Sequence, residues 1–342
     1  MDTRMIRPGP SDKDALVTDD GLVFCVFSYL HEPDRITAYL QYLPGGPDPR
    51  RDRVKPMDFP YVGAVVGTMD WLADHHPHYV DTCPVRGVRL PLVPVGRIAR
   101  YYRPEVRLAE LLAAPRDSLE ELAAQFARAI AAAAAIPLTA LGITGSVLLD
   151  LHDPATSDID LVVYGCAAAE RVRQAFLAGQ IEGVTGMTPP RVERWLHLMS
   201  TRHPHTLEEA AYFIARRWNY GFYRGREFSI KAIRSQDEIL EPWPSRPYRH
   251  GGLVRVRATI SQAWESGYLP AVYGLTDLQW LNGSEAVPAA TVASFEGLYA
   301  GAFDPGQRVE ICGRWEETGP GHYQIVVGSA EFSGREYIRL AM

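Results

Sequence analysis

The stretch from residue 141 to residue 165, LGITGSVLLDLHDPATSDIDLVVYG, restricts what this chain can fold into more than any other segment. Its apolar start, Leu141–Thr144, predicts a short buried strand, which Gly145 and Ser146 interrupt. A second strand is predicted over Asp158–Tyr164, where acidic and apolar residues alternate. Two short strands separated by a glycine turn therefore form the predicted centre of the fold.

Two acidic residues share one face of the second predicted strand. Because side chains alternate between the faces of a strand, Asp158 and Asp160 are expected to project from the same side, about 7 Å apart along the chain. Neighbouring carboxylates repel each other, and Mg²⁺ is commonly held by one or two carboxylates together with substrate phosphates. Gly145 and Ser146 supply backbone that can approach a phosphate closely. The two halves together predict metal-assisted phosphoryl transfer.

The order apolar-Gly-Ser, a spacer, then Asp-apolar-Asp-apolar resembles the signature of the DNA polymerase beta-like nucleotidyltransferase superfamily. The resemblance implies an enzyme that transfers a nucleoside monophosphate from a nucleoside triphosphate to a hydroxyl acceptor on RNA, protein or a small molecule, with release of pyrophosphate. It implies Asp158 and Asp160 as ligands of Mg²⁺, and Gly145 and Ser146 as contacts to the phosphates. A glycine turn that precedes a surface Ser-Asp-x-Asp turn by chance is the alternative.

The chain departs from the superfamily pattern in two ways. Members usually carry a third carboxylate on a later strand, and here Glu227 is the only acid in the strand predicted over Glu227–Arg234. Glu227 either completes the catalytic set or lies at a solvated strand edge. The basic residue that many relatives carry soon after Gly-Ser is also absent. Lys231, on the same strand face as Glu227, either binds the triphosphate or pairs with a surface acid, and Arg216 and Arg217 are further candidates.

The chain is predicted to be an α+β protein of three parts. Residues 106–248 are expected to form the nucleotidyltransferase domain, with a mixed sheet and flanking helices. Residues 1–105 are expected to form a small α+β domain. Residues 249–342 are expected to form a small OB-like β-barrel, and the proline-rich segment Glu241–Tyr248 precedes it as a linker. This layout resembles a group of predicted nucleotidyltransferases that occur as standalone proteins.

Short apolar segments separated by glycine turns predict the C-terminal barrel. The expected strands are Leu253–Ile260, Ala271–Leu275, Thr291–Phe295, Arg308–Arg314, Tyr323–Val327 and Tyr337–Leu340. Barrels of this kind often bind oligonucleotides on an open face, so RNA is a candidate partner. The residues that either form such a face or belong to the barrel core are Arg255, Arg257, Tyr273, Arg314, Trp315 and Tyr323.

Composition limits the classes of partner. The 342 residues are 46% hydrophobic, which is enough for several cores, and the formal net charge of −6 gives no general reason to expect nucleic acid or an anionic membrane. Four scattered cysteines lack metal-site spacing and fit a reducing compartment. The N-terminal residues lack an apolar core, and no apolar run is long enough to span a bilayer. We therefore expect a cytoplasmic protein without a membrane partner.

The segment from residue 61 to residue 78 contains a histidine cluster. Tyr61–Thr68 is predicted as a strand and Met69–His75 as a helix. The sequence His75-His76-Pro77-His78 contains three metal-ligand residues, but neighbours separated by a proline seldom converge on one point. A polar helix end is the expected role of this cluster, rather than a metal site.

A second class of function fits the same residues. A nucleotidyltransferase fold that keeps a nucleotide or RNA site but performs no chemistry would also contain Asp158, Asp160 and the glycine turn. The ambiguous third carboxylate and the missing basic residue favour such a binding module. Nucleotide binding without turnover would distinguish it from an enzyme.

Overall fold

The computed structural model describes residues 9–48, 51–54, 64–239, 243–244, 246–282, 288–329 and 331–341. The chain divides into two compact units. The first unit comprises Met1–Cys83, Val88–Gly186 and Trp218–Trp243, and the second comprises Pro84–Gly87, Met187–Arg217 and Pro244–Met342. Residues 187–217, predicted as part of the transferase domain, thus group with the C-terminal residues. Three residues of the predicted linker, Glu241, Pro242 and Ser245, lie outside the described residues.

An antiparallel sheet in the order β5-β6-β3-β2-β1-β7, with β4 paired to β3, begins the first unit. Its strands are β1 (Ala15–Thr18), β2 (Val23–Val26), β3 (Arg35–Asp48), β4 (Arg51–Val54), β5 (Val80–Thr82), β6 (Arg89–Pro94) and β7 (Ile98–Tyr102). The helical segments are α1 (Ala64–His75) and the 3-10 turns η2 (Pro77–Tyr79) and η3 (Val95–Arg97). Leu72 of α1 packs on one face of the sheet, among Leu16, Phe24 and Leu40.

The strand predicted over Tyr61–Thr68 is wrong where the structure describes it, because α1 already begins at Ala64. Residues 61–63 lie outside the described residues. A short apolar run has the same composition in a buried helix as in a buried strand, so periodicity alone could not separate the two.

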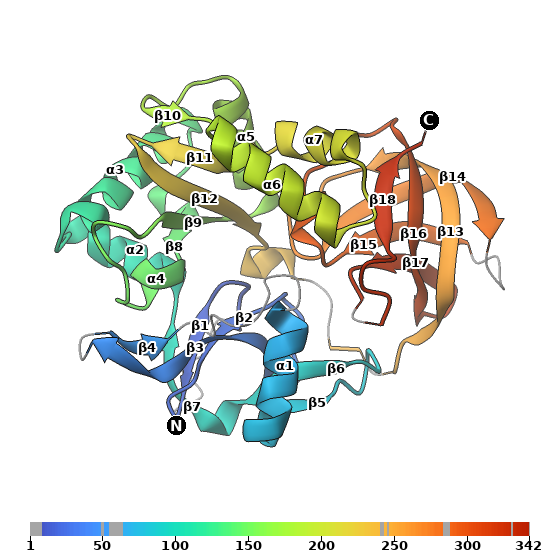
Figure 1. Ribbon diagram of the computed structural model, residues 1–342, viewed down its shortest axis with the longest axis horizontal. Coiled ribbons are helices and arrows are strands. Elements are labelled where there is room, and N and C mark those ends of the chain that lie inside the picture. The colour runs from blue at the N-terminus through green and yellow to red at the C-terminus, as the bar shows by residue number, and fades with distance from the viewer. Residues whose placement is uncertain are drawn as a thin grey trace. The chain divides into compact units, whose positions relative to one another are not determined.

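A mixed sheet in the order β10-β11-β12-β9-β8 forms the centre of the first unit (Figure 1). Its strands are β8 (Leu141–Ile143), β9 (Ile159–Tyr164), β10 (Val184–Thr185), β11 (Tyr220–Tyr223) and β12 (Arg226–Ile233). Its helices are α2 (Pro104–Ala113), α3 (Ser118–Ala133), α4 (Gly145–Leu148) and α5 (Cys166–Leu177), with the 3-10 turns η4 (Leu138–Ala140) and η5 (Gln236–Glu238). The predicted strands at residues 141, 158 and 227 are confirmed.

One face of this central sheet is fully apolar. Phe126 of α3 and Phe176 of α5 contact Phe228 of β12, with ring centroids 4.8 and 5.6 Å apart. Ile159 and Leu161 of β9 belong to the same core. Alternation therefore directs the remaining side chains of β9 and β12, including Asp160, to the opposite face.

A buried ionic network fixes the start of α3. The Asp117 carboxylate caps the helix by accepting hydrogen bonds from the amides of Leu119 and Glu120. Glu120 is completely buried and accepts hydrogen bonds from the guanidinium groups of Arg107 and Arg116. Burial acts to raise the pKa of Glu120, but the hydrogen bonds from Arg116 and the charges of Arg107 and Arg116 together outweigh it and hold the pKa below its ordinary value. Arg107 also donates to the Val147 carbonyl, so the network supports α4.

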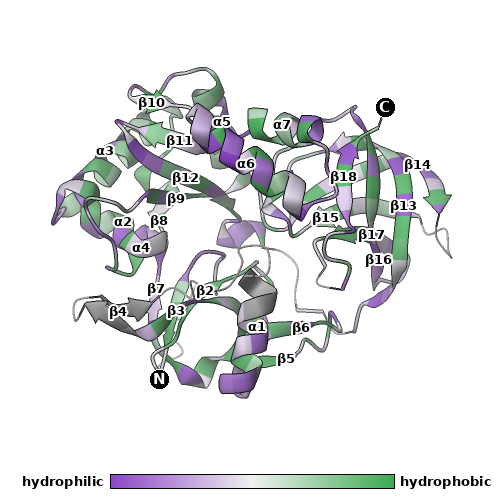
Figure 2. Ribbon diagram, in the orientation of Figure 1, coloured by the Kyte–Doolittle hydropathy of each residue, from purple (hydrophilic) through white to green (hydrophobic). Residues whose placement is uncertain are grey.

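The C-terminal part of the second unit is a closed five-stranded barrel. Its strands are β13 (Arg249–Gln262), β14 (Ala271–Asn282), β15 (Ala289–Ser294), β16 (Arg308–Gly319) and β17 (His322–Val327), and β18 (Tyr337–Leu340) pairs with β16. The order β13-β14-β15-β17-β16 closes because β16 also pairs with β13. All six predicted strands are confirmed, and both hydrophobic and hydrophilic residues occur along the strands of the barrel (Figure 2). The C-terminal β-barrel and the α+β class are thus as predicted.

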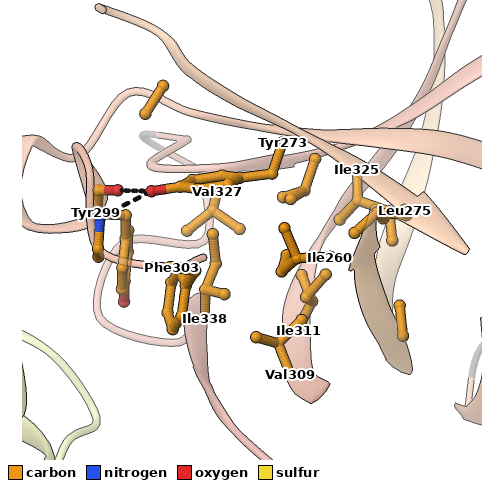
Figure 3. Packing of buried hydrophobic residues seen from close by; sticks show 14 of the residues in the cluster. Ile260, Tyr273, Leu275, Tyr299, Phe303, Val309, Ile311, Ile325, Val327 and Ile338 are labelled. Atoms are coloured by element: carbon orange, nitrogen blue, oxygen red, sulfur yellow. Dashed lines mark hydrogen bonds between the residues drawn. The ribbon is translucent and has the colours of Figure 1, made fainter. Parts of the chain in front are cut away.

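The barrel interior contains several residues that the sequence offered as an RNA-binding face. Tyr273 is fully buried, and its hydroxyl donates to the Tyr299 carbonyl beside Phe303 (Figure 3). Trp315 and Arg314 are also buried. A ring packed in a core cannot stack on a base, so of the two alternatives the structure shows the barrel core for Tyr273 and Trp315.

Two helices complete the second unit. They are α6 (Pro189–Arg202) and α7 (Leu207–Ala215), and the 3-10 turn η6 (Gly297–Tyr299) follows β15. Thr206 precedes α7 and forms a capping box with Glu209. Phe213 and Met199 pack into the barrel core, and His205 hydrogen-bonds the Tyr299 hydroxyl at 2.8 Å. These contacts explain why residues 187–217 belong with the barrel.

The four cysteines, all within described parts of the chain, are thiols, and Cys25, Cys83 and Cys312 are buried. Among the described residues, no helix combines the length and the apolar character needed to cross a membrane.

We predict that Asp14 makes stability fall as pH rises. Burial raises the pKa of its carboxyl from 3.8 to about 8. Hydrogen bonds from the Tyr101 hydroxyl and the Ser11 amide act to lower this pKa but do not offset the effect of burial. The folded state therefore binds a proton that the unfolded state releases between these values, and stability decreases across that range. Asp14→Asn should raise the free energy of unfolding by at least about 2 kcal/mol at pH 8.5, since one pKa unit is worth about 1.4 kcal/mol, and by less at pH 5.

Urea denaturation at both pH values measures this difference. Asp34→Asn, at an exposed position, is the control and should change stability equally at the two pH values. An equal effect of Asp14→Asn at pH 5 and pH 8.5 would contradict the prediction.

Candidate active site

The starts of two parallel strands lie side by side at the polar face of the central sheet. In the register of β9 and β12, Ser229 is the partner of Asp160, and Phe228 is the partner of Ile159. Asp158 immediately precedes β9, which begins at Ile159, one residue later than predicted. Asp158 is exposed and Asp160 is half-buried. The acidic pair therefore lies at the edge of the sheet, with Asp160 the more enclosed of the two.

Gly145 passes directly over the Asp160 carboxylate. The Thr144 amide donates to the Asp160 carbonyl at 2.9 Å, which brings the end of β8 next to this residue. Gly145 has a φ of +67°, and a Cβ placed on it would lie 2.4 Å from Oδ2 of Asp160. Both the backbone conformation and the lack of space require glycine here. The structure thus brings together the two halves of the predicted site.

Ser146 lies in the first turn of the short helix α4 and is half-buried. Its carbonyl accepts the Leu151 amide at 2.9 Å, which closes the turn behind it. Leu148 and Leu149 pack against Ala15 and Val17 of the N-terminal sheet. The hydrogen bond from Leu151 and the packing of Leu148 and Leu149 therefore both hold the glycine turn in place.

Glu227 is level with Asp158 across the two parallel strands. Phe228 is the register partner of Ile159. Glu227 precedes Phe228 and Asp158 precedes Ile159, so the two acidic residues occupy equivalent positions at the starts of the two strands. Glu227 is half-buried, and alternation places it on the same face as Ser229 and Asp160. Its position is compatible with a third carboxylate of the site.

Lys231 shares the face of Ser229 but has a defined neighbour. Its ammonium group donates to the Tyr220 hydroxyl and lies 4.1 Å from the centroid of that ring. Of the two predicted alternatives, pairing with a surface acid is not what the structure shows, because the neighbour is a tyrosine. Arg216 pairs with Asp304, and Arg217 donates to the Gly297 carbonyl, so both have contacts within the second unit.

Three residues near the acidic pair were not found from the sequence. The Ser229 hydroxyl donates to Oδ1 of Asp160. Tyr42 of β3 has its pKa raised by burial and further by the charges of Asp160 and Asp158, which places its phenol near both. Strand alternation could have indicated Ser229, but no local signal connects Tyr42 to residues so distant in sequence.

Arg226 is the third missed residue and positions the loop before Asp158. Its guanidinium donates to the carbonyl oxygens of Pro154, Ala155 and Ser157 at 2.8 to 3.0 Å. These three hydrogen bonds fix the conformation of the loop that leads into β9. A single arginine at a strand start gives no sequence signal for this role.

We expect Gly145→Ala to disable the site without unfolding the protein. The added methyl group must displace the Asp160 carboxylate or the turn, and the positive φ costs roughly 1–2 kcal/mol. Gly179→Ala is a matched control, since Gly179 has a φ of +65° but nothing within 4 Å of the added Cβ. Both variants should lose similar stability in thermal melts, whereas only Gly145→Ala should lose Mg²⁺-dependent nucleotide binding in calorimetry. Equal binding by the two variants would contradict this role of Gly145.

Comparison with known proteins gives a distant relative. The chain is 25% identical to an uncharacterized protein of Methanocaldococcus jannaschii over an alignment that covers 96% of this chain and 98% of that protein. No family model matches the chain, and no solved structure matches it. The similarity extends over both units of the chain.

Proposed function

We propose that the protein is a Mg²⁺-dependent nucleotidyltransferase. The observation that carries the proposal is the contact between Gly145 and Asp160, which joins a glycine turn to a carboxylate pair in one place. Asp158 and Asp160 would hold Mg²⁺, and Gly145 and Ser146 would contact the phosphates of a nucleoside triphosphate. Carboxylates with substrate phosphates are the ligand set that Mg²⁺ commonly uses. The fold would then be a polymerase beta-like transferase core with an OB-like barrel.

The chain's own groups have separable tasks in this proposal. The bound metal supplies neutralisation of charge on the attacking and leaving oxygens. Ser229 holds the Asp160 carboxylate in place by its hydrogen bond, and Arg226 holds the loop that ends at Asp158. Glu227 would accept the proton of the attacking acceptor hydroxyl. The products are a nucleoside monophosphate joined to the acceptor, and pyrophosphate.

Incubation with α-labelled nucleoside triphosphates, Mg²⁺ and total cellular RNA tests the proposal. Label in RNA, in the protein itself or in an added small molecule would identify the acceptor class. Pyrophosphate release is measured in parallel. Neither label transfer nor pyrophosphate release from any nucleoside triphosphate would contradict the enzymatic function.

A non-catalytic nucleotide- or RNA-binding module is the second candidate. The observation in its favour is the contact of Lys231 with Tyr220, which engages the cation expected to meet the triphosphate. On the barrel, Arg255 is exposed and Tyr323 is half-buried, so these two remain candidates for RNA contact. Calorimetric binding of Mg-nucleotide without pyrophosphate release would favour this module. In either case we expect a cytoplasmic protein.

A further inference from the structure

Two histidines that the sequence assigned to a polar helix end converge on one carboxylate. His76 follows α1, and His78 lies in η2, with Pro77 between them. Asp20 lies in the turn between β1 and β2, and its Oδ2 is 3.2 Å from Nδ1 of His76 and 3.7 Å from Nε2 of His78. The three donor atoms all lie within 4.8 Å of one another. The proline, which was expected to separate the histidines, begins the 3-10 turn that brings them together.

The carboxylate of Asp20 is held in position by its other oxygen. Oδ1 accepts hydrogen bonds from the Thr18 hydroxyl at 2.6 Å and from the Tyr79 hydroxyl at 2.8 Å. Tyr79 is itself completely buried, so its hydroxyl is fixed. Hydrogen bonds of this kind orient the ligands of metal sites and leave the second oxygen directed at the ion.

The distances of the two imidazole donors from Asp20 are compatible with a shared metal ion. Donors of a tetrahedral Zn²⁺ ion lie about 3.3 Å apart, because the bonds are about 2.0–2.1 Å long. The two distances to Asp20 bracket this value, and 3.7 Å is too long for a hydrogen bond.

We propose that Asp20, His76 and His78 form a binding site for a divalent transition metal of the Zn²⁺ class. Two imidazoles and a carboxylate suit Zn²⁺, whereas Mg²⁺ prefers oxygen ligands, so this site is distinct from the Asp158 and Asp160 pair. Side chains of His76 and His78 are 26% and 38% exposed, which leaves a fourth position for water. The metal would tie the β1–β2 turn to the end of α1 and stabilise the N-terminal sheet.

One charged group opposes a cation at this place. Nη2 of Arg97 lies 3.9 Å from Oδ2 of Asp20, but it pairs more closely with Asp19, at 3.0 Å. The Asp19 carboxylate therefore draws the guanidinium away from the donors. When Asp19 and Asp20 are both ionised, the side chains of Asp19, Asp20 and Arg97 together carry a net negative charge, which favours a metal cation.

Titration of the tag-free, chelator-treated full chain with Zn²⁺ in a calorimeter tests the proposal, with excess Mg²⁺ present to occupy the acidic pair. We expect one Zn²⁺ per chain and a rise in melting temperature on binding. His76→Ala and His78→Ala should each weaken Zn²⁺ binding by at least about 100-fold, and Tyr79→Phe by about 10–100-fold through the lost orientation of Asp20. His75→Ala is the matched control, because its Nδ1 contacts the Trp71 carbonyl instead, and it should bind Zn²⁺ normally.

Two results would overturn the proposal. The first is no Zn²⁺ uptake by the wild-type chain, which would leave the cluster as histidine–aspartate ion pairs alone. The second is equal affinity in all four variants, which would place bound Zn²⁺ elsewhere. Because no nucleotide is present, neither result depends on the proposed transferase activity.

Discussion

Asp160→Asn is expected to reduce Mg²⁺-dependent nucleotidyl transfer by about 10³-fold or more while the protein remains folded. Asp160 is the more enclosed carboxylate of the pair, and the replacement removes the charge that would hold the metal. A metal ion of this kind stabilises the transition state by several kcal/mol. Because each 1.4 kcal/mol changes the rate tenfold, the loss of the metal corresponds to a decrease in rate of this size. Asparagine keeps an oxygen that accepts from Ser229, so the local hydrogen bond survives.

Pyrophosphate release at saturating nucleoside triphosphate, as a function of Mg²⁺ concentration, measures this effect. The melting temperature of the variant should match or exceed the wild-type value, because one repulsive charge is gone. Asp34→Asn, at an exposed position immediately before β3, serves as the charge-matched control. Unchanged Mg²⁺ dependence of transfer in Asp160→Asn would contradict the assignment of this residue as a metal ligand.

Glu227→Gln should leave Mg-nucleotide binding nearly intact and slow transfer by about 10²–10⁴-fold, the usual contribution of a general base. The physical reason is position: the parallel register makes Glu227 level with Asp158 at the strand starts. Asp158 and Asp160 can hold the nucleotide's metal without it. Binding and chemistry are therefore expected to separate in this variant.

Single-turnover transfer by wild type and Glu227→Gln at saturating Mg-nucleotide provides the measurement. Glu121→Gln is a suitable control, since Glu121 is an exposed residue of α3, the helix that packs on the apolar face of the sheet. Asp237 is the alternative acid, but it follows the far end of β12, about 20 Å along the strand from Glu227. An unaltered rate in Glu227→Gln, with a decrease in Asp237→Asn, would transfer the role to Asp237.

Local patterns in the sequence were sufficient for the strands of the candidate site and of the barrel. Alternation of Asp158 and Asp160 with apolar neighbours predicted β9 and its two faces. Glycine turns between short apolar runs predicted all six strands from residue 249 onward. These features were accessible because strand alternation and turns depend on residues close together in the chain.

Contacts between distant segments decided what the sequence left open. Parallel pairing of β9 and β12 placed Ser229 beside Asp160 and Glu227 level with Asp158, and packing of the N-terminal sheet brought Tyr42 near both acids. Tyr273 has the aromatic ring that stacking on a base requires, yet its burial in the barrel core excludes that role.

The histidine cluster shows the same division between sequence and tertiary structure. The sequence supplied two potential metal ligands separated by a proline, but it contained nothing that linked them to Asp20. The antiparallel pairing that forms the β1–β2 turn and the packing of Tyr79 in the core bring the carboxylate to the imidazoles. Sequence by itself determined which donors exist and which local elements carry them. Only the tertiary structure decided which donors meet, because the free energy that fixes strand register and core packing comes from residues far apart in the chain.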